Sequence, residues 1–280
     1  MDKKNCIVIA AGGTGGHVFP SISLANYLMK DYDIEIFTDE RGTKYLNTHK
    51  NIKIKKITSS RVFSKNIIYF IIGIIKVFSS IIFSIILLIK RKPKLIIGMG
   101  GYSSFPVCLS GFFLKIPVFI YENNLIIGRA NKILLPFSKK ILVSTNSIQG
   151  IDNKYKNKIS HIGFLLRDNI LGVKTTNLEI TKSNLSILVI GGSQSAKVFG
   201  EQIPVVIEEC NKKGIKFNIY QQCLEYQKKD IQNIYGKLKT KFELFTFCDD
   251  LLKYYEKSDI AITRCGASSM AELVNLRIPF

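Results

Sequence analysis

Short apolar runs rich in β-branched residues alternate with helix-length segments along the chain, and this alternation limits the possible folds more than any other feature. Strands separated by helices form βαβ units, which build a parallel sheet covered by helices. We therefore expect an α/β protein. The first series of expected strands comprises 6–10, 34–38, 52–57, 94–98, 116–121 and 140–144, and the second comprises 185–190, 217–221, 242–247, 259–263 and 278–280.

A polar stretch rich in Asn, Lys, Ser and Thr separates the two series, interrupted by one apolar patch at 162–166. At roughly 150 residues per domain, 280 residues accommodate two domains. We predict domains at 1–150 and 185–280, joined by a linker region at 151–184. Because the second series stops on the first residues of a strand, we expect the second domain to be incomplete.

The charge balance points to an anionic partner. The 40 Lys and Arg exceed the 21 Asp and Glu, which gives a formal net charge of +19. Only seven of these cations are Arg, whereas proteins that read base sequence depend on Arg for bidentate contacts. We therefore expect no nucleic acid, and retain anionic lipid or a phosphorylated substrate.

The cysteines and the N-terminus indicate a cytoplasmic protein. The six cysteines lie far apart without a C-x-x-C pair, so we interpret them as reduced, buried side chains rather than metal ligands. The apolar run near the N-terminus is too short for a signal peptide. Asp31 and Asp33 have the spacing of a metal-binding pair, but we interpret them as part of a solvated turn, and predict no metal site.

Residues 67–89 are almost wholly apolar and are followed by the basic run 90–94. The segment is long enough to span a bilayer, which needs about 20 apolar residues. It lies between two expected strands of one sheet, however, where a crossover helix is required. We predict a crossover helix with one face touching the membrane, with a plain buried helix and a transmembrane span as alternatives. Less apolar residues recur every three or four positions and draw one narrow stripe along this helix: Asn66, Tyr69, Gly73, Lys76, Ser80 and Ser84.

Three glycine-rich turns follow expected strands, at 12–16, 98–102 and 191–196. Open α/β sheets bind ligands at the carboxyl ends of their strands, and a helix that starts there offers free amides to a phosphate. The first turn is not a dinucleotide fingerprint, because Val18 occupies the position of the third glycine. Two such edges on consecutive domains predict a ligand-binding cleft between the domains.

A fourth segment, 264–272, follows the fourth strand of the second series. Ser268 or Ser269 could cap the next helix, with Glu272 one turn inside it. The residues alone leave helix capping and ligand binding both open.

These motifs, together with Glu122, Asn123, Asn124 and Gly128, occur in the order and spacing of the MurG family, glycosyltransferase family 28, and the chain resembles that family along its whole length. The resemblance implies a GT-B fold, in which two Rossmann-like domains with parallel sheets face an interdomain cleft. It implies a first domain that binds a lipid-linked acceptor and docks on the membrane, and a second that binds a UDP-sugar.

The activity implied by the resemblance is inverting transfer of N-acetylglucosamine from UDP-N-acetylglucosamine to undecaprenyl-diphosphate-muramoyl-pentapeptide (lipid I). The product, lipid II, is a precursor of peptidoglycan. The resemblance places the protein peripherally on the cytoplasmic face of the bacterial plasma membrane, with no cofactor and no metal. Its oligomeric state stays open.

The resemblance also assigns roles to residues. In the displacement that the resemblance implies, His17 is our candidate for the general base because an imidazole titrates near neutrality, although it could instead orient the acceptor diphosphate. Ser193 matches a serine that contacts the nucleotide diphosphate, the backbone of Cys248 matches a uracil contact, and Glu272 matches the acid that holds the ribose hydroxyls. The residues that resemble other parts of the sugar-nucleotide site are Thr14, Gly15, Gly16, Asn124 and Arg167. The residues that match the loop and helix start beside the nucleotide are Ala267, Ser268, Ser269, Met270 and Ala271.

Two other functions fit part of the sequence pattern. A catalytically weak remnant of such an enzyme would keep the apolar helix while losing the sugar site. A nicotinamide-dependent oxidoreductase would share the alternating sheet, but it needs the glycine that Val18 replaces.

Overall fold

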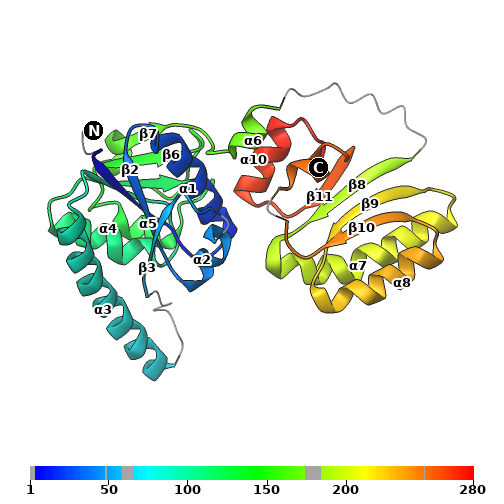
Figure 1. The fold of residues 1–280 in the computed structure, drawn as a ribbon, viewed down its shortest axis with the longest axis horizontal. Helices are drawn as coiled ribbons and strands as arrows, with labels where there is room; N and C mark the ends of the chain where they lie inside the picture. Colours follow the sequence, from blue (N-terminus) through cyan, green and yellow to red (C-terminus); the bar gives the residue numbers. More distant parts are fainter. Residues whose placement is uncertain (1–3, 48, 59–65, 174–183, 249) are drawn as a thin grey trace. The chain divides into compact units, whose positions relative to one another are not determined.

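A computed structural model describes residues 4–47, 49–58, 66–173, 184–248 and 250–280. The chain divides into two compact units, Met1–Arg167 and Asp168–Phe280 (Figure 1). The first unit therefore extends past residue 150 and includes the start of the expected linker region. Residues 174–183 of that region lie outside the described residues.

The first unit is built on a seven-stranded sheet in the order β3-β2-β1-β4-β5-β6-β7, with every neighbouring pair parallel. The alternation of strands and helices predicted the first six strands to within two residues. It missed β7, which lies in the polar stretch. The strands are β1 (Cys6–Ala10), β2 (Asp33–Thr38), β3 (Lys53–Lys56), β4 (Leu95–Gly98), β5 (Val118–Glu122), β6 (Lys140–Val143) and β7 (Ile159–His161).

Helices cover both faces of this sheet, so its central strands are apolar on both sides. In β1, Ile7 and Ile9 belong to one buried cluster, and Val8 and Ala10 belong to the other. This split follows from the two-residue period of a strand. The helices are α1 (Gly15–Leu28), α2 (Glu40–Leu46), α3 (Ile67–Arg91), α4 (Ser104–Phe113), α5 (Arg129–Leu134) and the 3-10 helix η1 (Asn153–Lys158).

The second unit has a four-stranded parallel sheet in the order β10-β9-β8-β11. The expected strand at 278–280 is wrong: this segment forms no strand, although the amide of Ala261 donates to the carbonyl of Pro279 at 2.8 Å. The strands are β8 (Leu185–Ile190), β9 (Phe217–Gln222), β10 (Lys241–Phe245) and β11 (Ile260–Thr263). The helices are α6 (Asp168–Leu171), α7 (Gly192–Lys212), η2 (Glu225–Gln227), α8 (Lys228–Lys237), α9 (Leu252–Tyr255) and α10 (Ala267–Asn275).

Each sheet has one point where the direction of winding reverses. In the first sheet the chain passes from β1 to β2 and β3 on one side, and then crosses back to β4 on the other side of β1. In the second sheet β8 lies between β9 and β11 in the same way. The loops that leave two such neighbouring strands separate to opposite faces and leave a crevice at the carboxyl edge, where open α/β sheets bind ligands.

Helix α3 joins β3 to β4 and packs along α4, as a crossover helix does. Its buried residues are the small Gly73, Ser80 and Ser84 and, near its C-terminal end, Leu88. The Ser110 hydroxyl of α4 donates to the carbonyl of Ile81 at 3.0 Å. Tyr69 and Lys76 of the expected stripe are instead exposed. The contact with α4 therefore uses only part of that stripe.

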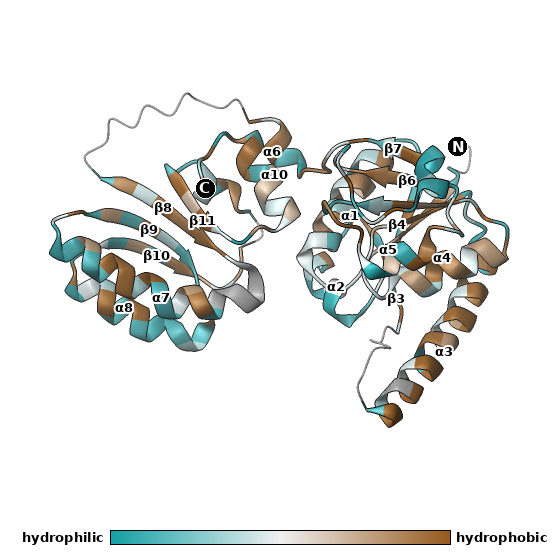
Figure 2. Cartoon of the chain, turned by 180° about the vertical axis from the view of Figure 1, so that it is seen from behind, coloured by the Kyte–Doolittle hydropathy of each residue, from teal (hydrophilic) through white to brown (hydrophobic). Residues whose placement is uncertain are grey.

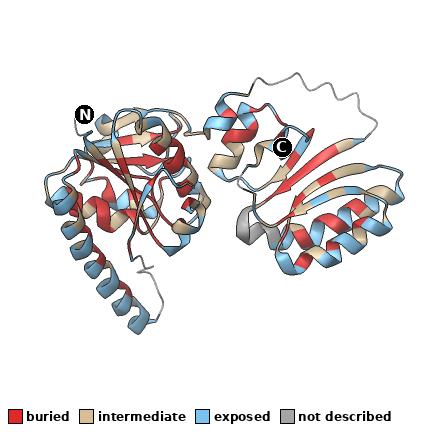
Figure 3. Ribbon diagram, viewed as in Figure 1, coloured by how far each residue is buried: buried red, intermediate tan, exposed pale blue. Residues whose placement is uncertain are grey.

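The opposite face of α3 is apolar and exposed, as Figures 2 and 3 show. A plain buried helix is therefore wrong. By length and composition alone, α3 could cross a membrane. Its C-terminal end is fixed to the sheet by Arg91, which pairs with Glu35 at 2.6 Å and Asp33 at 3.3 Å. The large exposed side chains on α3 are Ile67, Ile68, Tyr69, Ile71, Ile72, Ile74, Ile75, Phe78, Ile82, Phe83, Ile86 and Ile89.

The buried small face of α3 generates a stability prediction. Ser84 is fully buried, so Ser84→Leu should lower the free energy of unfolding by about 1–3 kcal/mol through overpacking. The matched control, Ile86→Leu on the exposed face, should change it by less than about 0.5 kcal/mol. Urea unfolding followed by circular dichroism measures both. Equal effects, or a larger effect at Ile86, would contradict this orientation of α3.

Candidate active site

The first glycine turn connects β1 to α1 at the winding reversal of the first sheet. Gly13 has a φ of +87°, a conformation that favours glycine. A Cβ atom on Gly15 would lie 2.8 Å from Cε2 of Phe19, so a larger residue here would displace that ring. Thr14 is the exposed N-cap residue of α1, and within the described chain its side chain makes no cap hydrogen bond. The first amides of α1 therefore face this edge of the sheet.

The second glycine turn, after β4, packs directly against the first. Gly100 and Gly101 have φ values of +90° and +81°. A Cβ atom on Gly100 would lie 2.9 Å from both Cε1 and Nδ1 of His17, so the imidazole rests on backbone that only glycine can provide. His17 thus joins the two turns on either side of the β1–β4 crevice.

The surroundings of His17 favour a neutral imidazole. Burial lowers its pKa below the usual value of 6.5, and the charge of Glu122 and a backbone hydrogen bond at Met99 offset this only in part. Nδ1 is buried and has no hydrogen-bond partner among the described residues. A neutral ring at pH 7 is the protonation state that a general base requires.

Glu122 organises the loop that follows β5. Its carboxylate is buried and accepts hydrogen bonds from the amide and side chain of Asn124, at 3.0 and 2.7 Å, and from the Gly128 amide at 2.8 Å. Nδ2 of Asn131 donates to it at 3.0 Å. Asn124, an expected substrate contact, is therefore an exposed residue whose amide group is held by Glu122.

The adjacent residue, Asn123, was missed as a site residue. Its side chain donates to the carbonyl of Gly16 at 3.0 Å and so ties the loop after β5 to the first turn of α1. The signal in the sequence was a run of two amide side chains directly after a buried strand. Such residues at the carboxyl edge have backbone groups of neighbouring loops within reach.

Arg167 lies beside the first glycine turn. Its guanidinium carbon is 5.3 Å from the ring centroid of Phe19 on α1. The segment before it is fixed to the sheet by Tyr121, whose hydroxyl donates to Gly163 O at 3.2 Å and accepts from the Leu165 amide at 3.3 Å. Burial raises the pKa of Tyr121 to about 12, so this hydroxyl stays protonated. The first unit thus brings Arg167 together with the expected residues Thr14, Gly15, Gly16 and His17.

In the second unit, the third glycine turn leads from β8 into α7. Ser193 is in the first turn of α7, and its side chain lies outside the described atoms. Gln222, which sequence reasoning missed, accepts from the Gly191 amide at 3.2 Å and donates to Thr246 O at 3.1 Å. One side chain therefore connects the segments that follow β8 and β10 at the carboxyl edge.

Helix α10 follows β11, the strand beside β8, so α7 and α10 begin on either side of the second winding reversal. The serine cap, one of the two alternatives that the sequence left open, is wrong. Gly266 is the N-cap residue, and Ser268 and Ser269 lie inside the helix. The Ser268 hydroxyl is buried, with no hydrogen-bond partner in the described part of the chain. Ala267, Met270 and Ala271 complete the first turns of this helix.

Glu272 is buried in the second turn of α10 and accepts a hydrogen bond from the Tyr255 hydroxyl at 2.9 Å. This hydrogen bond holds the Glu272 carboxylate in place, and sequence reasoning missed Tyr255. Cys248 is half-buried after β10, where its thiol donates to Asp250 O at 3.1 Å. Cys248 packs against the apolar cluster that contains Tyr255 and Leu273. Leu273 is the residue next to Glu272 in α10.

The acidic pair considered for metal binding lies at the opposite edge. Asp33 begins β2, so it lies at the amino end of that strand, away from the glycine turns, and pairs with Lys53 at 2.5 Å. Over the described ranges, no three His, Cys, Asp or Glu side chains gather as a metal site.

Comparisons with known proteins agree with this architecture. The family model of the glycosyltransferase family 28 N-terminal domain matches residues 7–143, and that of the C-terminal domain matches residues 186–280. A UDP-N-acetylglucosamine--N-acetylmuramyl-(pentapeptide) pyrophosphoryl-undecaprenol N-acetylglucosamine transferase from Pelagibacter ubique is 38% identical over the whole chain, which spans 77% of that relative. The transferase of the same name from Rickettsia felis is 34% identical over 98% of the chain and 77% of its own length.

Solved structures share the fold. MurG from Acinetobacter baumannii matches 98% of the chain and 76% of its own length with a TM-score of 0.73 and 24% identity. A UDP-GlcNAc 2-epimerase from Neisseria meningitidis, bound to UDP-GlcNAc, matches 92% of the chain and 77% of its own length with a TM-score of 0.60 and 16% identity. The expected α/β class with GT-B architecture is confirmed. With both halves matched and relatives above 30% identity along its length, the chain belongs to glycosyltransferase family 28.

Proposed function

We propose that this protein transfers N-acetylglucosamine from UDP-N-acetylglucosamine to undecaprenyl-diphosphate-linked muramoyl-pentapeptide, the step of peptidoglycan synthesis that converts lipid I to lipid II. The observation that carries the proposal is the match of both halves of the chain to family 28, with relatives of that activity aligned to its full length. The crevices at the two winding reversals give each half a place for a phosphorylated ligand.

The reaction is a single displacement with inversion. An acceptor hydroxyl attacks the anomeric carbon, the bond to UDP breaks, and the hydroxyl proton passes to a base. Neutral His17, held at the β1–β4 crevice, is our candidate for that base. The N-termini of α7 and α10 flank the β8–β11 crevice, where they would stabilise the charge that develops on the leaving diphosphate.

We assign the donor to the second unit. Ser193 and residues 267–271 would contact the nucleotide there, the Cys248 backbone would meet the uracil, and Glu272 would accept hydrogen bonds from the ribose hydroxyls. We assign the acceptor to the first unit, and Thr14, Gly15, Gly16, Asn124 and Arg167 would contact substrate there.

The exposed face of α3 suggests how the protein meets its acceptor. A polyprenyl tail stays in the bilayer, so the first unit would dock on the membrane surface. The apolar face of α3 lies directly before Lys90, Lys92 and Lys94, which suits an interface containing anionic lipid. We therefore propose peripheral attachment to the cytoplasmic face of the plasma membrane.

The assignment of Glu272 predicts a loss of nucleotide affinity. Glu272→Ala should weaken UDP binding at least tenfold, because each lost charge-assisted hydrogen bond costs about 1.5–3 kcal/mol. Tyr255→Phe is the matched control, since it removes the bond within the protein and keeps the carboxylate. It should change UDP affinity by less than about threefold. Calorimetry measures both, and unchanged UDP affinity in a folded Glu272→Ala protein would leave Glu272 a purely structural role.

The reaction and the role of His17 are tested together by radiolabelled sugar transfer. The wild-type chain should label the lipid-linked acceptor, and His17→Asn should lower turnover by about 10²–10⁴ while UDP affinity is retained. Because burial lowers the pKa of His17, the acidic limb of the kcat/KM profile should lie below pH 6.5. A wild-type protein that labels no acceptor would refute the proposed function. A limb above pH 7, or equal losses of UDP binding and turnover in His17→Asn, would refute the base assignment alone.

Membrane attachment is tested by flotation with vesicles that contain anionic lipid. Binding should weaken as salt rises but persist, because salt screens the lysines and not the apolar contact. Replacing Phe78 and Phe83 with Ser should reduce binding about tenfold or more, since both side chains would lose burial in the interface. The control is Tyr27→Ser, which removes an exposed aromatic from α1. Binding that ignores lipid charge, or protease protection showing that α3 spans the bilayer, would contradict the docking proposal.

A further inference from the structure

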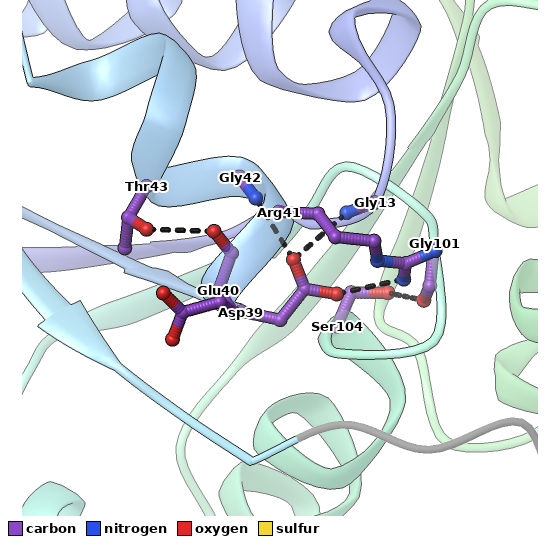
Figure 4. A network of polar contacts seen from close by, with 8 residues as sticks. All are labelled: Gly13, Asp39, Glu40, Arg41, Gly42, Thr43, Gly101 and Ser104. Atoms are coloured by element: carbon purple, nitrogen blue, oxygen red, sulfur yellow. Dashed lines mark hydrogen bonds and ion pairs between the residues drawn. The ribbon is translucent and has the colours of Figure 1, made fainter.

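One buried carboxylate connects α2 to the first glycine turn. Asp39 directly follows β2 and is 3% exposed. Its Oδ1 accepts from the amide of Gly42 at 2.9 Å and from the amide of Gly13 at 3.2 Å, and its Oδ2 accepts from Nη2 of Arg41 at 2.8 Å (Figure 4). Asp39 therefore fixes both the backbone of the turn and the position of a cation beside it.

The guanidinium of Arg41 lies against this turn. A Cβ atom on Gly13 would be 3.5 Å from Nη2 and 3.9 Å from Cζ of Arg41, which are ordinary van der Waals distances, so the cation lies next to the backbone of this turn. The Arg41 side chain is 45% exposed, whereas that of Asp39 is 5% exposed. A guanidinium has five N–H donors, and in the part of the chain that the structure describes Asp39 is the ion-pair partner of Arg41, so this exposed side chain can offer further donors to a ligand.

The surroundings of the guanidinium suit a diphosphate. The first amides of α1 start at the same turn. Ser103, at the start of α4, packs against Gly12, and its fully buried hydroxyl has no hydrogen-bond partner among the residues described. The planar fork of an arginine matches two phosphate oxygens at once, and a carboxylate behind it keeps that fork in one orientation.

We propose that Arg41 donates hydrogen bonds to the diphosphate of the lipid-linked acceptor, and that Asp39 is the residue that positions it. This inference rests on the proposed function. Donor and acceptor both carry a diphosphate, and the acceptor is favoured because Arg41 shares a unit with the exposed apolar face of α3, while the second unit has its own pair of helix N-termini.

The test compares Arg41→Gln, Arg41→Lys and Asp39→Asn with the wild type, in steady-state transfer and in direct binding of a soluble short-prenyl acceptor analogue. Arg41→Gln should raise the acceptor KM and Kd about 10- to 100-fold, the equivalent of one or two charge-assisted hydrogen bonds. The donor KM, kcat and UDP affinity should change by less than about twofold. Arg41→Lys keeps the charge without the fork, so its effect should be smaller.

Asp39→Asn should raise the acceptor KM almost as much, because the new amide nitrogen would face the Arg41 donor. The double variant Asp39→Asn/Arg41→Gln should have an acceptor KM only slightly above that of Asp39→Asn, since both changes remove the same interaction. The matched control is Lys44→Gln, which removes an equal charge from the exposed side of the same helix and should leave both KM values unchanged.

Three results would overturn the inference: an unchanged acceptor KM and Kd in Arg41→Gln, a rise in the donor KM instead, or a fall in kcat and melting temperature without a change in either KM. Each of them is distinct from failure of the proposed function, in which the wild type itself transfers no sugar.

Discussion

The reversal of winding in each sheet is the constraint on which the rest of the structure depends. Right-handed crossovers on a parallel sheet place successive helices on one face until the strand order reverses, and the loops then separate. In the first sheet the reversal lies between β1 and β4, and in the second between β8 and β11. The three glycine turns and the start of α10 all lie at these two points.

Close packing at the first reversal depends on glycine. His17 rests on Gly100, and a Cβ atom on Gly101 would clash with the carbonyl of Gly12. Bulk at either position would separate the two turns and move the imidazole. Asp39 holds the first turn from the α2 side, and Asn123 holds the start of α1 from the β5 side. The backbone amides of the crevice are thereby fixed before any ligand arrives, which is the arrangement that electrostatic stabilisation requires.

Sequence reasoning was most successful where burial produces a regular spacing of apolar residues. The central strands carry apolar residues on both faces, and the turns after them contain the glycines that sharp turns need, so both were predictable. It missed β7, because Ile159, Ser160 and His161 form a short edge strand that pairs with only one neighbour. It left a serine cap of α10 as an alternative, since a glycine N-cap satisfies no helix amide with a side chain and leaves a weak signal.

Other features depend on contacts that composition does not encode. The helical period of 67–89 was clear, but which of its faces would be buried, the apolar or the small one, depended on α4, whose Ser110 reaches the backbone of Ile81. Glu122 ends β5 and Asp39 directly follows β2, and only the distances from their carboxylates to backbone amides identify them as the residues that hold the neighbouring turns. The family roles of Ser193 and Glu272 likewise came from resemblance rather than from pattern.

The central claim is that the two reversals bind different ligands, the nucleotide at β8–β11 and the lipid-linked acceptor at β1–β4. Hydrogen–deuterium exchange with and without UDP-N-acetylglucosamine tests it most directly, because it reports on the backbone amides of each turn. The account predicts slower exchange at the first turns of α7 and α10, with the turns at 12–16 and 98–102 far less affected. Slower exchange confined to the turns of the first unit would contradict it.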